Sequence, residues 1–178
     1  MSLNGCIENK PQEVACIGDS ITYGYGVNKK DSWVYKINEK TKNKYILNNY
    51  GICGQRMQDM NWNQEIDEDI CLILLGTNDA FSWDEQAFQK SVDVGLQSLK
   101  GKKIFVLLPP AIVQDEYYDL ILKEKIIPVL KKMAEKYHLE TIDLYSLTEG
   151  HSEYYSDGLH LNKEGNEVVA KEIIRYLR

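Results

Sequence analysis

The sequence lacks any apolar run long enough to cross a bilayer. Its longest apolar stretches, residues 70–76 and 104–110, are far shorter than the roughly 20 residues that a membrane-spanning helix needs. The first twelve residues also lack the apolar core of a signal peptide. We therefore expect no integral membrane segment and a cytoplasmic protein. A signal peptide removed ahead of residue 1 is the alternative.

Positive charge is scarce as well. The chain has 21 lysine and arginine residues against 27 aspartate and glutamate residues, which gives a net charge of −6. Binding to nucleic acid needs a basic surface, and the lysines of residues 40–44 are surrounded by acids. We expect no nucleic-acid partner. The sequence does not indicate an oligomeric state.

Cysteines are few and form no CxxC pair. The four are Cys6, Cys16, Cys53 and Cys71, and two of them lie inside apolar runs. This pattern favours free, buried thiols in a reducing compartment over disulfides or a zinc site.

The chain otherwise alternates between apolar runs and helix-like stretches. Its 178 residues suit one domain spanning 1–178. The alternation predicts the α/β class, with a five-stranded parallel sheet covered by helices on both faces. Strands are expected at 13–18, 45–51, 69–76, 102–109 and 139–145, and helices at 32–41, 84–100, 117–138 and 162–178.

The expected helices carry finer predictions. Pro128 should kink or split the helix over 117–138, because proline has no N–H to donate. Asn162 is placed to cap the last helix, and Trp33 should pack in the core. In the helix over 84–100 the spacing predicts one buried face, formed by Phe88, Val92, Leu96 and Leu99.

Polar residues follow several of the expected strands. Ser20 comes after the first strand, Gly54 after the second, and Asn78 after the third. Asp157 and His160 follow the fifth. In parallel sheets ligands bind beyond the carboxyl ends of the strands, so we expect these residues to meet at one edge.

Ser20 needs a base and an orienting acid to act as a nucleophile. Asp157 lies three residues before His160, close enough to hold one imidazole nitrogen while the other faces Ser20. The N–H groups of Ser20 and Gly54 and the side chain of Asn78 are candidate donors for an oxyanion. We interpret the adjacent Asp19 as a carboxylate that orders the loop by accepting backbone N–H groups.

Four segments together resemble the sequence blocks of the SGNH hydrolases, also called the GDSL esterase/lipase family. They are GDSITYG (18–24), NYGICG (49–54), GTND (76–79) and DGLHLNKEG (157–165). The resemblance implies a flavodoxin-like three-layer α/β/α fold and ester hydrolysis without a metal or other cofactor. It also implies a catalytic triad of Ser20, Asp157 and His160 and an oxyanion hole of Ser20, Gly54 and Asn78.

Three other hypotheses about the function remain open. A metal-dependent hydrolase would use Asp19, Asn78, Asp79 and His160 as ligands, although no HxH or HExxH motif is present. An α/β-hydrolase elbow would need glycine where Thr22 stands. A binding module without catalysis would use the same fold.

The expected substrate is a small-molecule ester with a short acyl group, above all acetyl, on a carbohydrate or other small alcohol. The strands, helices and loops use the whole chain, which leaves no room for a lid over a deep acyl tunnel. A lysophospholipase or acyl-thioesterase is the alternative. Aromatic residues of the edge loops are candidates to line the cleft: Tyr23, Tyr25, Trp62, Phe81, Trp83, Tyr117, Tyr154 and Tyr155.

Overall fold

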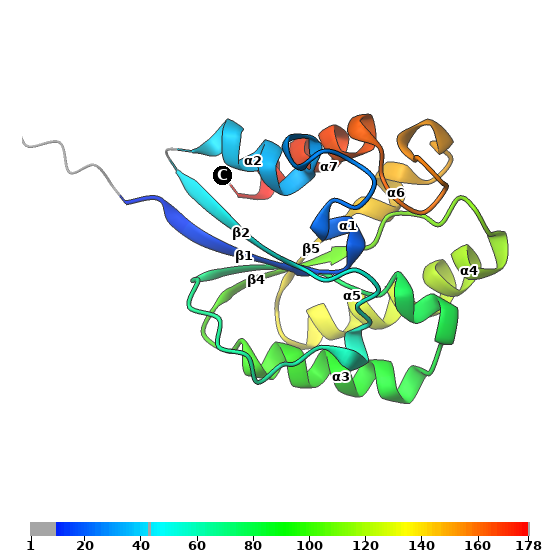
Figure 1. Ribbon diagram of the computed structural model, residues 1–178. Helices are drawn as coiled ribbons and strands as arrows, with labels where there is room; N and C mark the ends of the chain where they lie inside the picture. The colour runs from blue at the N-terminus through cyan, green and yellow to red at the C-terminus, as the bar shows by residue number, and fades with distance from the viewer. Residues whose placement is uncertain (1–9, 43, 178) are drawn as a thin grey trace, which may run out of the picture.

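Five parallel strands form the central sheet of the computed structural model, which describes residues 10–42 and 44–177 (Figure 1). Their order across the sheet is β2-β1-β3-β4-β5. All five lie where the sequence predicts a strand. They are β1 (Gln12–Gly18), β2 (Tyr45–Gly51), β3 (Ile70–Leu74), β4 (Lys103–Leu108) and β5 (Glu140–Asp143).

Helices cover both faces of this sheet (Figure 1). The helices α2 (Trp33–Thr41) and α7 (Lys163–Tyr176) pack on one face, and α3 (Glu85–Ser98) and α5 (Ile127–Lys136) pack on the other. Each layer closes over its own apolar cluster, and β3 is buried on both faces, as its continuous apolar sequence requires. The predicted three-layer α/β/α fold is confirmed.

Several finer predictions for the helices are also confirmed. The expected inner face of α3 is buried, and Asn162 caps α7 by accepting the N–H groups of Glu164 and Gly165 at 2.9 and 3.0 Å. Trp33 is fully buried and its indole N–H donates to the carbonyl of Ile21 at 3.2 Å. No helix in the described ranges is long and apolar enough to cross a membrane.

The stretch around Pro128 is split, as expected. The helix α4 (Glu116–Ile121) passes into a wider π-helical turn, Leu122–Ile126, and α5 begins directly after it. A proline in a helix removes one hydrogen bond and its ring clashes with the carbonyl four residues earlier. The wider turn before Pro128 relieves that clash, so the chain continues as two helices.

Two predictions of element ends are wrong. The fifth strand stops at Asp143, and Leu144 and Tyr145 begin the short helix α6 (Leu144–Thr148). The side chain of Asp143 accepts the Ser146 N–H at 2.9 Å, so it caps a helix that apolar periodicity alone could not separate from a strand. The third strand likewise ends at Leu74, before the predicted end at residue 76.

The cysteine prediction is correct for two residues. Cys16 and Cys71 are free and buried in β1 and β3. Cys53 is free but exposed, because it lies in the loop after β2, beyond the cover of the helices. Cys6 lies outside the described residues.

Candidate active site

Ser20 opens a single helical turn, α1 (Ser20–Tyr23), immediately after β1. Asp19, and not Ser20, caps this turn: its Oδ1 accepts the N–H of Ile21 at 2.9 Å, which confirms the loop-ordering role expected of it. Gly18 makes the turn possible, because a Cβ at that position would lie 2.1 Å from Oγ1 of Thr22. The tight turn fixes Ser20 at the carboxyl end of the sheet.

His160 and Asp157 reach Ser20 from the loop before α7. The Oγ of Ser20 lies 3.0 Å from Nε2 of His160, and Nδ1 of His160 lies 2.8 Å from Oδ2 of Asp157. The other carboxylate oxygen of Asp157 accepts the N–H groups of Leu159 and His160 at 3.0 and 2.7 Å. The structure thus brings the three predicted triad residues into one continuous chain of hydrogen bonds.

The environment of Asp157 keeps it ionised. Burial opposes this, but hydrogen bonds from the backbone and ring of His160 and from the backbone of Leu159 outweigh it and lower the pKa of Asp157 to about 2. A carboxylate is an acceptor only, so its partner Nδ1 carries the hydrogen. The unprotonated Nε2 then faces the hydroxyl of Ser20, which is the arrangement that a general base needs.

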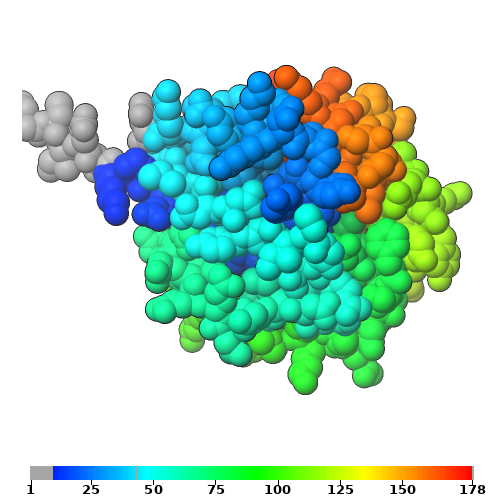
Figure 2. All heavy atoms as spheres, in the orientation of Figure 1, coloured from blue at the N-terminus to red at the C-terminus, as the bar shows by residue number. Residues whose placement is uncertain are grey.

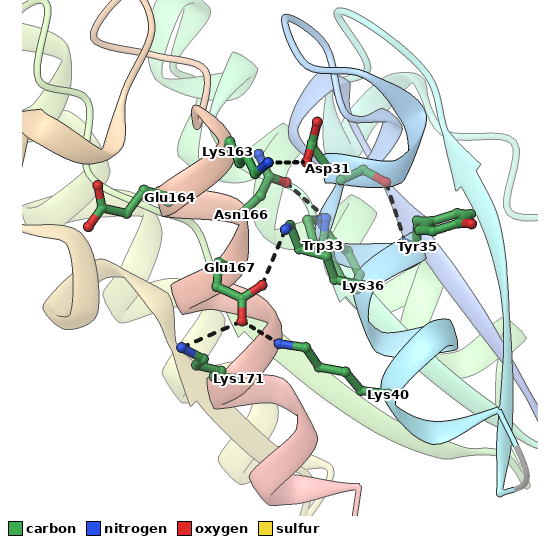
Figure 3. A network of polar contacts seen from close by, with 12 residues as sticks. Asp31, Trp33, Tyr35, Lys36, Lys40, Lys163, Glu164, Asn166, Glu167 and Lys171 are labelled. Atoms are coloured by element: carbon green, nitrogen blue, oxygen red, sulfur yellow. Dashed lines mark hydrogen bonds and ion pairs between the residues drawn. The ribbon is translucent and has the colours of Figure 1, made fainter.

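The loop that carries His160 is held by the contact between α7 and α2 (Figure 3). The side chain of Asn166 accepts the N–H of Trp33 at 2.9 Å, and Glu167 pairs with Lys36 at 3.2 Å and with Lys40. The hydrogen bond from Lys40 is the main cause that lowers the pKa of Glu167 to about 2. These contacts fix the start of α7, and with it the position of the imidazole two residues before the helix cap.

The three candidate oxyanion donors belong to the segments that follow β1, β2 and β3. Gly54 has a φ of +78°, which favours glycine, and a Cβ placed there would meet no atom within 4 Å. In the described chain no protein acceptor takes the N–H of Ser20 or of Gly54. Both donors are therefore available to a ligand, and the space in front of Gly54 is open.

The amide of Asn78 is more constrained than the sequence suggests. Its Nδ2 donates to the carbonyl of Gln55 at 3.1 Å and lies 3.4 Å from Oδ2 of Asp19. An amide nitrogen has two hydrogens, so an oxyanion would have to take the place of the longer contact, the one with Asp19. Sequence reasoning missed both partners, because they lie 23 and 59 positions away along the chain.

Two buried carboxyl groups flank this amide. Burial raises the pKa of Asp19 to about 7, and the nearby charge of Asp79 raises it further against the hydrogen bond from Ile21. Burial likewise raises the pKa of Asp79 to about 6, although its Oδ2 accepts the Met57 N–H at 3.0 Å. Asp19, whose Oδ2 lies 3.4 Å from the amide nitrogen of Asn78, therefore changes charge near neutral pH.

The residues that a metal-dependent hydrolase would use do not form a typical set of metal ligands. Within residues 10–42 and 44–177, no group of three or more His, Cys, Asp or Glu side chains is placed to hold a metal ion. Both ring nitrogens of His160 are already engaged, one by Ser20 and one by Asp157. The metal-dependent alternative is left to a chelation experiment.

The edge-loop aromatics have different surroundings. The ring of Tyr25 lies 4.5 Å from the ring of His160, and Tyr23 is 59% exposed. Phe81 packs on Tyr118 at 4.5 Å and stays partly exposed. Trp62, by contrast, packs against Gly95 of α3. Of the aromatics that the sequence singles out, Tyr25 is thus in direct contact with a predicted catalytic residue.

Sequence comparison supports a relationship with esterases. A family model described as the GDSL-like Lipase/Acylhydrolase family matches residues 16–168. An acetylxylan esterase of Xylanibacter ruminicola is 26% identical over 200 aligned residues, which cover 90% of this chain and 42% of that protein. The chain therefore spans less than half the length of the curated relative that it matches.

Solved structures share the fold. A lipolytic protein of the G-D-S-L family from Veillonella parvula superposes with a TM-score of 0.81 at 24% identity, over 92% of this chain and 97% of that one. The acetyl xylan esterase AlAXEase gives a TM-score of 0.82 at 23% identity, over 93% and 100% of the two chains. With the family model covering most of its length, the chain belongs to the GDSL-like lipase/acylhydrolase family.

Proposed function

We propose that the protein is a serine esterase that removes short acyl groups, above all acetyl, from a carbohydrate or another small alcohol. The observation that carries the proposal is the hydrogen-bonded chain from Ser20 through His160 to Asp157. The acetylxylan esterase relative supports the acetylated carbohydrate as substrate class. A lysophospholipase or acyl-thioesterase is the alternative within the family.

The first half of the reaction transfers the acyl group to the enzyme. The Oγ of Ser20 attacks the ester carbonyl carbon while Nε2 of His160 takes the hydroxyl proton. The negative charge that develops on the carbonyl oxygen is stabilised by the N–H groups of Ser20 and Gly54 and by the amide of Asn78. The bond to the alcohol oxygen then breaks, and His160 donates its proton to the leaving alcohol.

The second half returns the free enzyme. A water molecule gives up a proton to Nε2 of His160 and attacks the acyl-Ser20 carbonyl carbon. The same donors stabilise the second tetrahedral intermediate, and collapse releases the carboxylic acid as the proton returns to Oγ of Ser20. Asp157 stays ionised throughout and stabilises the imidazolium form of His160 in both halves.

The preference for a short acyl group rests on how open the site is. Selectivity for long chains requires an apolar wall, since each buried methylene contributes about 0.8 kcal/mol. Beside Gly54 there is open space, with no atom within 4 Å of an added Cβ. A longer chain would therefore bury few of its methylenes there, and kcat/KM would gain little from them.

Replacing Ser20 by alanine tests the proposal. The purified Ser20→Ala protein should lose about 10³-fold or more of its kcat/KM for p-nitrophenyl acetate while its circular dichroism spectrum is unchanged. Ser98→Ala, on α3, is the matched control and should retain full activity. Mass spectrometry after treatment with a fluorophosphonate should find the label on Ser20. A variant that keeps a tenth of the wild-type rate would show that Ser20 is not the nucleophile.

A further inference from the structure

A groove of about 1070 Å³ runs between the segment that leads from α1 into α2 and the outer edge of β2. In Figure 2 it belongs to the face on which the blue segment of residues 20–35 meets the cyan segment of β2. Tyr23, Lys29, Tyr35, Asn49 and Gly51 are among the residues that line it. We propose that this groove binds the carbohydrate chain that carries the ester, an inference that rests on the proposed function.

One end of the groove adjoins the candidate nucleophile. Tyr23 follows Ser20 by three residues in α1, and residues three apart share one face of a helix. A Cβ on Gly51 would lie 2.2 Å from the backbone nitrogen of Tyr23, so α1 rests directly on the end of β2. Gly54 follows three residues later. Ser20 itself does not line the groove, so the ligand must pass Tyr23 and Gly51 to bring its ester to Ser20.

The floor of the groove offers a hydrogen-bond donor and an acceptor. Asn38 binds the N–H and the carbonyl of Leu47 through its side-chain amide, at 2.7 and 2.9 Å, so the backbone of Leu47 faces away from β1. Backbone groups alternate along a strand, which places those of Asn49 on the same outer side. In the described chain no protein group pairs with them. Sugar hydroxyls both donate and accept, and they match this pair.

The walls of the groove suit a neutral, ring-shaped ligand. The residues Tyr23 and Tyr35 are 59% and 37% exposed, and the C–H faces of sugar rings pack on aromatic faces. Among the described residues that line the groove, Lys29 is the only one with a charged side chain, so an anionic headgroup would find one cation. A long acyl chain would remain exposed to solvent along this open groove. An added β-strand would find the backbone of Leu47 already occupied by Asn38.

The groove is large enough for more than one sugar ring. Its volume of about 1070 Å³ lies at the upper end of the roughly 300–1,000 Å³ of pockets that hold drug-sized ligands. An acetylated oligosaccharide should therefore have a higher kcat/KM than an acetylated monosaccharide, because the additional rings bind along α2. The gain should appear in KM, since these rings lie away from the reacting atoms.

Tyr35→Ala is the variant that tests the groove. In the structure the ring of Tyr35 is exposed and α2 tolerates alanine, while the hydrogen bond of its backbone N–H to Ser32 is kept. The measured quantity is the ratio of kcat/KM for acetylated xylotetraose to kcat/KM for p-nitrophenyl acetate. Tyr35→Ala should lower this ratio about 3- to 10-fold through KM, in line with the loss of one aromatic contact.

Two controls define the result. Tyr35→Phe keeps the ring and should hold the ratio within twofold, and Val94→Ala removes an exposed side chain on the opposite layer and should leave it unchanged. An unchanged ratio in Tyr35→Ala, or an equal fall in Val94→Ala, overturns the inference. A wild-type enzyme that depends on Ser20 but does not favour the oligosaccharide also overturns it while the proposed function stands. Full activity of Ser20→Ala would instead overturn the proposed function.

Discussion

Replacing Asp19 by asparagine should make the stability of the protein less dependent on pH. Asp19 is fully buried, and burial raises its pKa from 3.8 to about 7. The folded protein therefore binds this proton more tightly than the unfolded chain does. The sign of the effect follows from that difference. The contribution of Asp19 to the free energy of unfolding is greatest below pH 3.8, falls as the pH rises to about 7, and is constant at higher pH.

The size of the effect follows from the pKa difference. At about 1.4 kcal/mol per pKa unit, the free energy of unfolding falls by about 4 kcal/mol in total, of which about 3 kcal/mol is lost between pH 5 and pH 8. Asparagine can cap α1 but cannot accept from both Ile21 and Asn78, which costs about 1 kcal/mol. That cost does not vary with pH, so it cancels when two pH values are compared.

The assay is urea unfolding of the wild type and Asp19→Asn at pH 5 and pH 8. The stability of the variant relative to wild type should rise by about 3 kcal/mol from the lower to the higher pH. Asp84→Asn is the matched control, because Asp84 caps α3 in the same way but is exposed. Its difference from wild type should be the same at both pH values. A pH-independent difference for Asp19→Asn would refute the reasoning.

The remaining predictions concern catalysis. Asn78→Ala should lower kcat about 10²–10³-fold with little change in KM, as for a lost oxyanion donor, and a change confined to KM would reassign Asn78 to substrate binding. Dialysis against EDTA should leave activity unchanged, whereas loss that a divalent ion restores would establish the metal-dependent alternative. Across p-nitrophenyl esters from acetate to decanoate, measured below their micelle limits, kcat/KM should not rise steadily with chain length. A steady rise would move the protein to the lysophospholipase or thioesterase alternative.

The sequence predicts the sheet well because its strands are buried on both faces. Continuous apolar runs such as that of β3 are typical of strands that are covered on both faces in an α/β protein. The same regularity brings Ser20, Asn78 and His160 to one edge, since parallel strands all end there. The end of β5 is harder to predict from the sequence. Leu144 and Tyr145 are apolar and would suit a strand or a helix, and only the N-cap at Asp143 shows that they begin α6.

Contacts between distant segments could not be predicted. Nothing in the local sequence indicates that the amide of Asn78 meets Asp19 and Gln55, or that the ring of Tyr25 contacts that of His160. The groove at β2 depends on how α2 packs over the edge strand, which is set by the whole layer. The exposure of Cys53 depends on the path of one loop after β2.

The contact between α7 and α2 ties the proposed activity to a late step in the folding of this domain. Ser20 and its expected base His160 are 140 positions apart, and the loop of the base is held by α7. During synthesis the N-terminal part of a chain emerges first, so the nucleophile is exposed well before its partner exists. A nascent chain that has not reached residue 160 carries Ser20 without the imidazole, and a chain truncated before α7 has His160 but no helix to hold its loop. Under the proposed function, esterase activity should therefore return during refolding only once α7 has packed against α2.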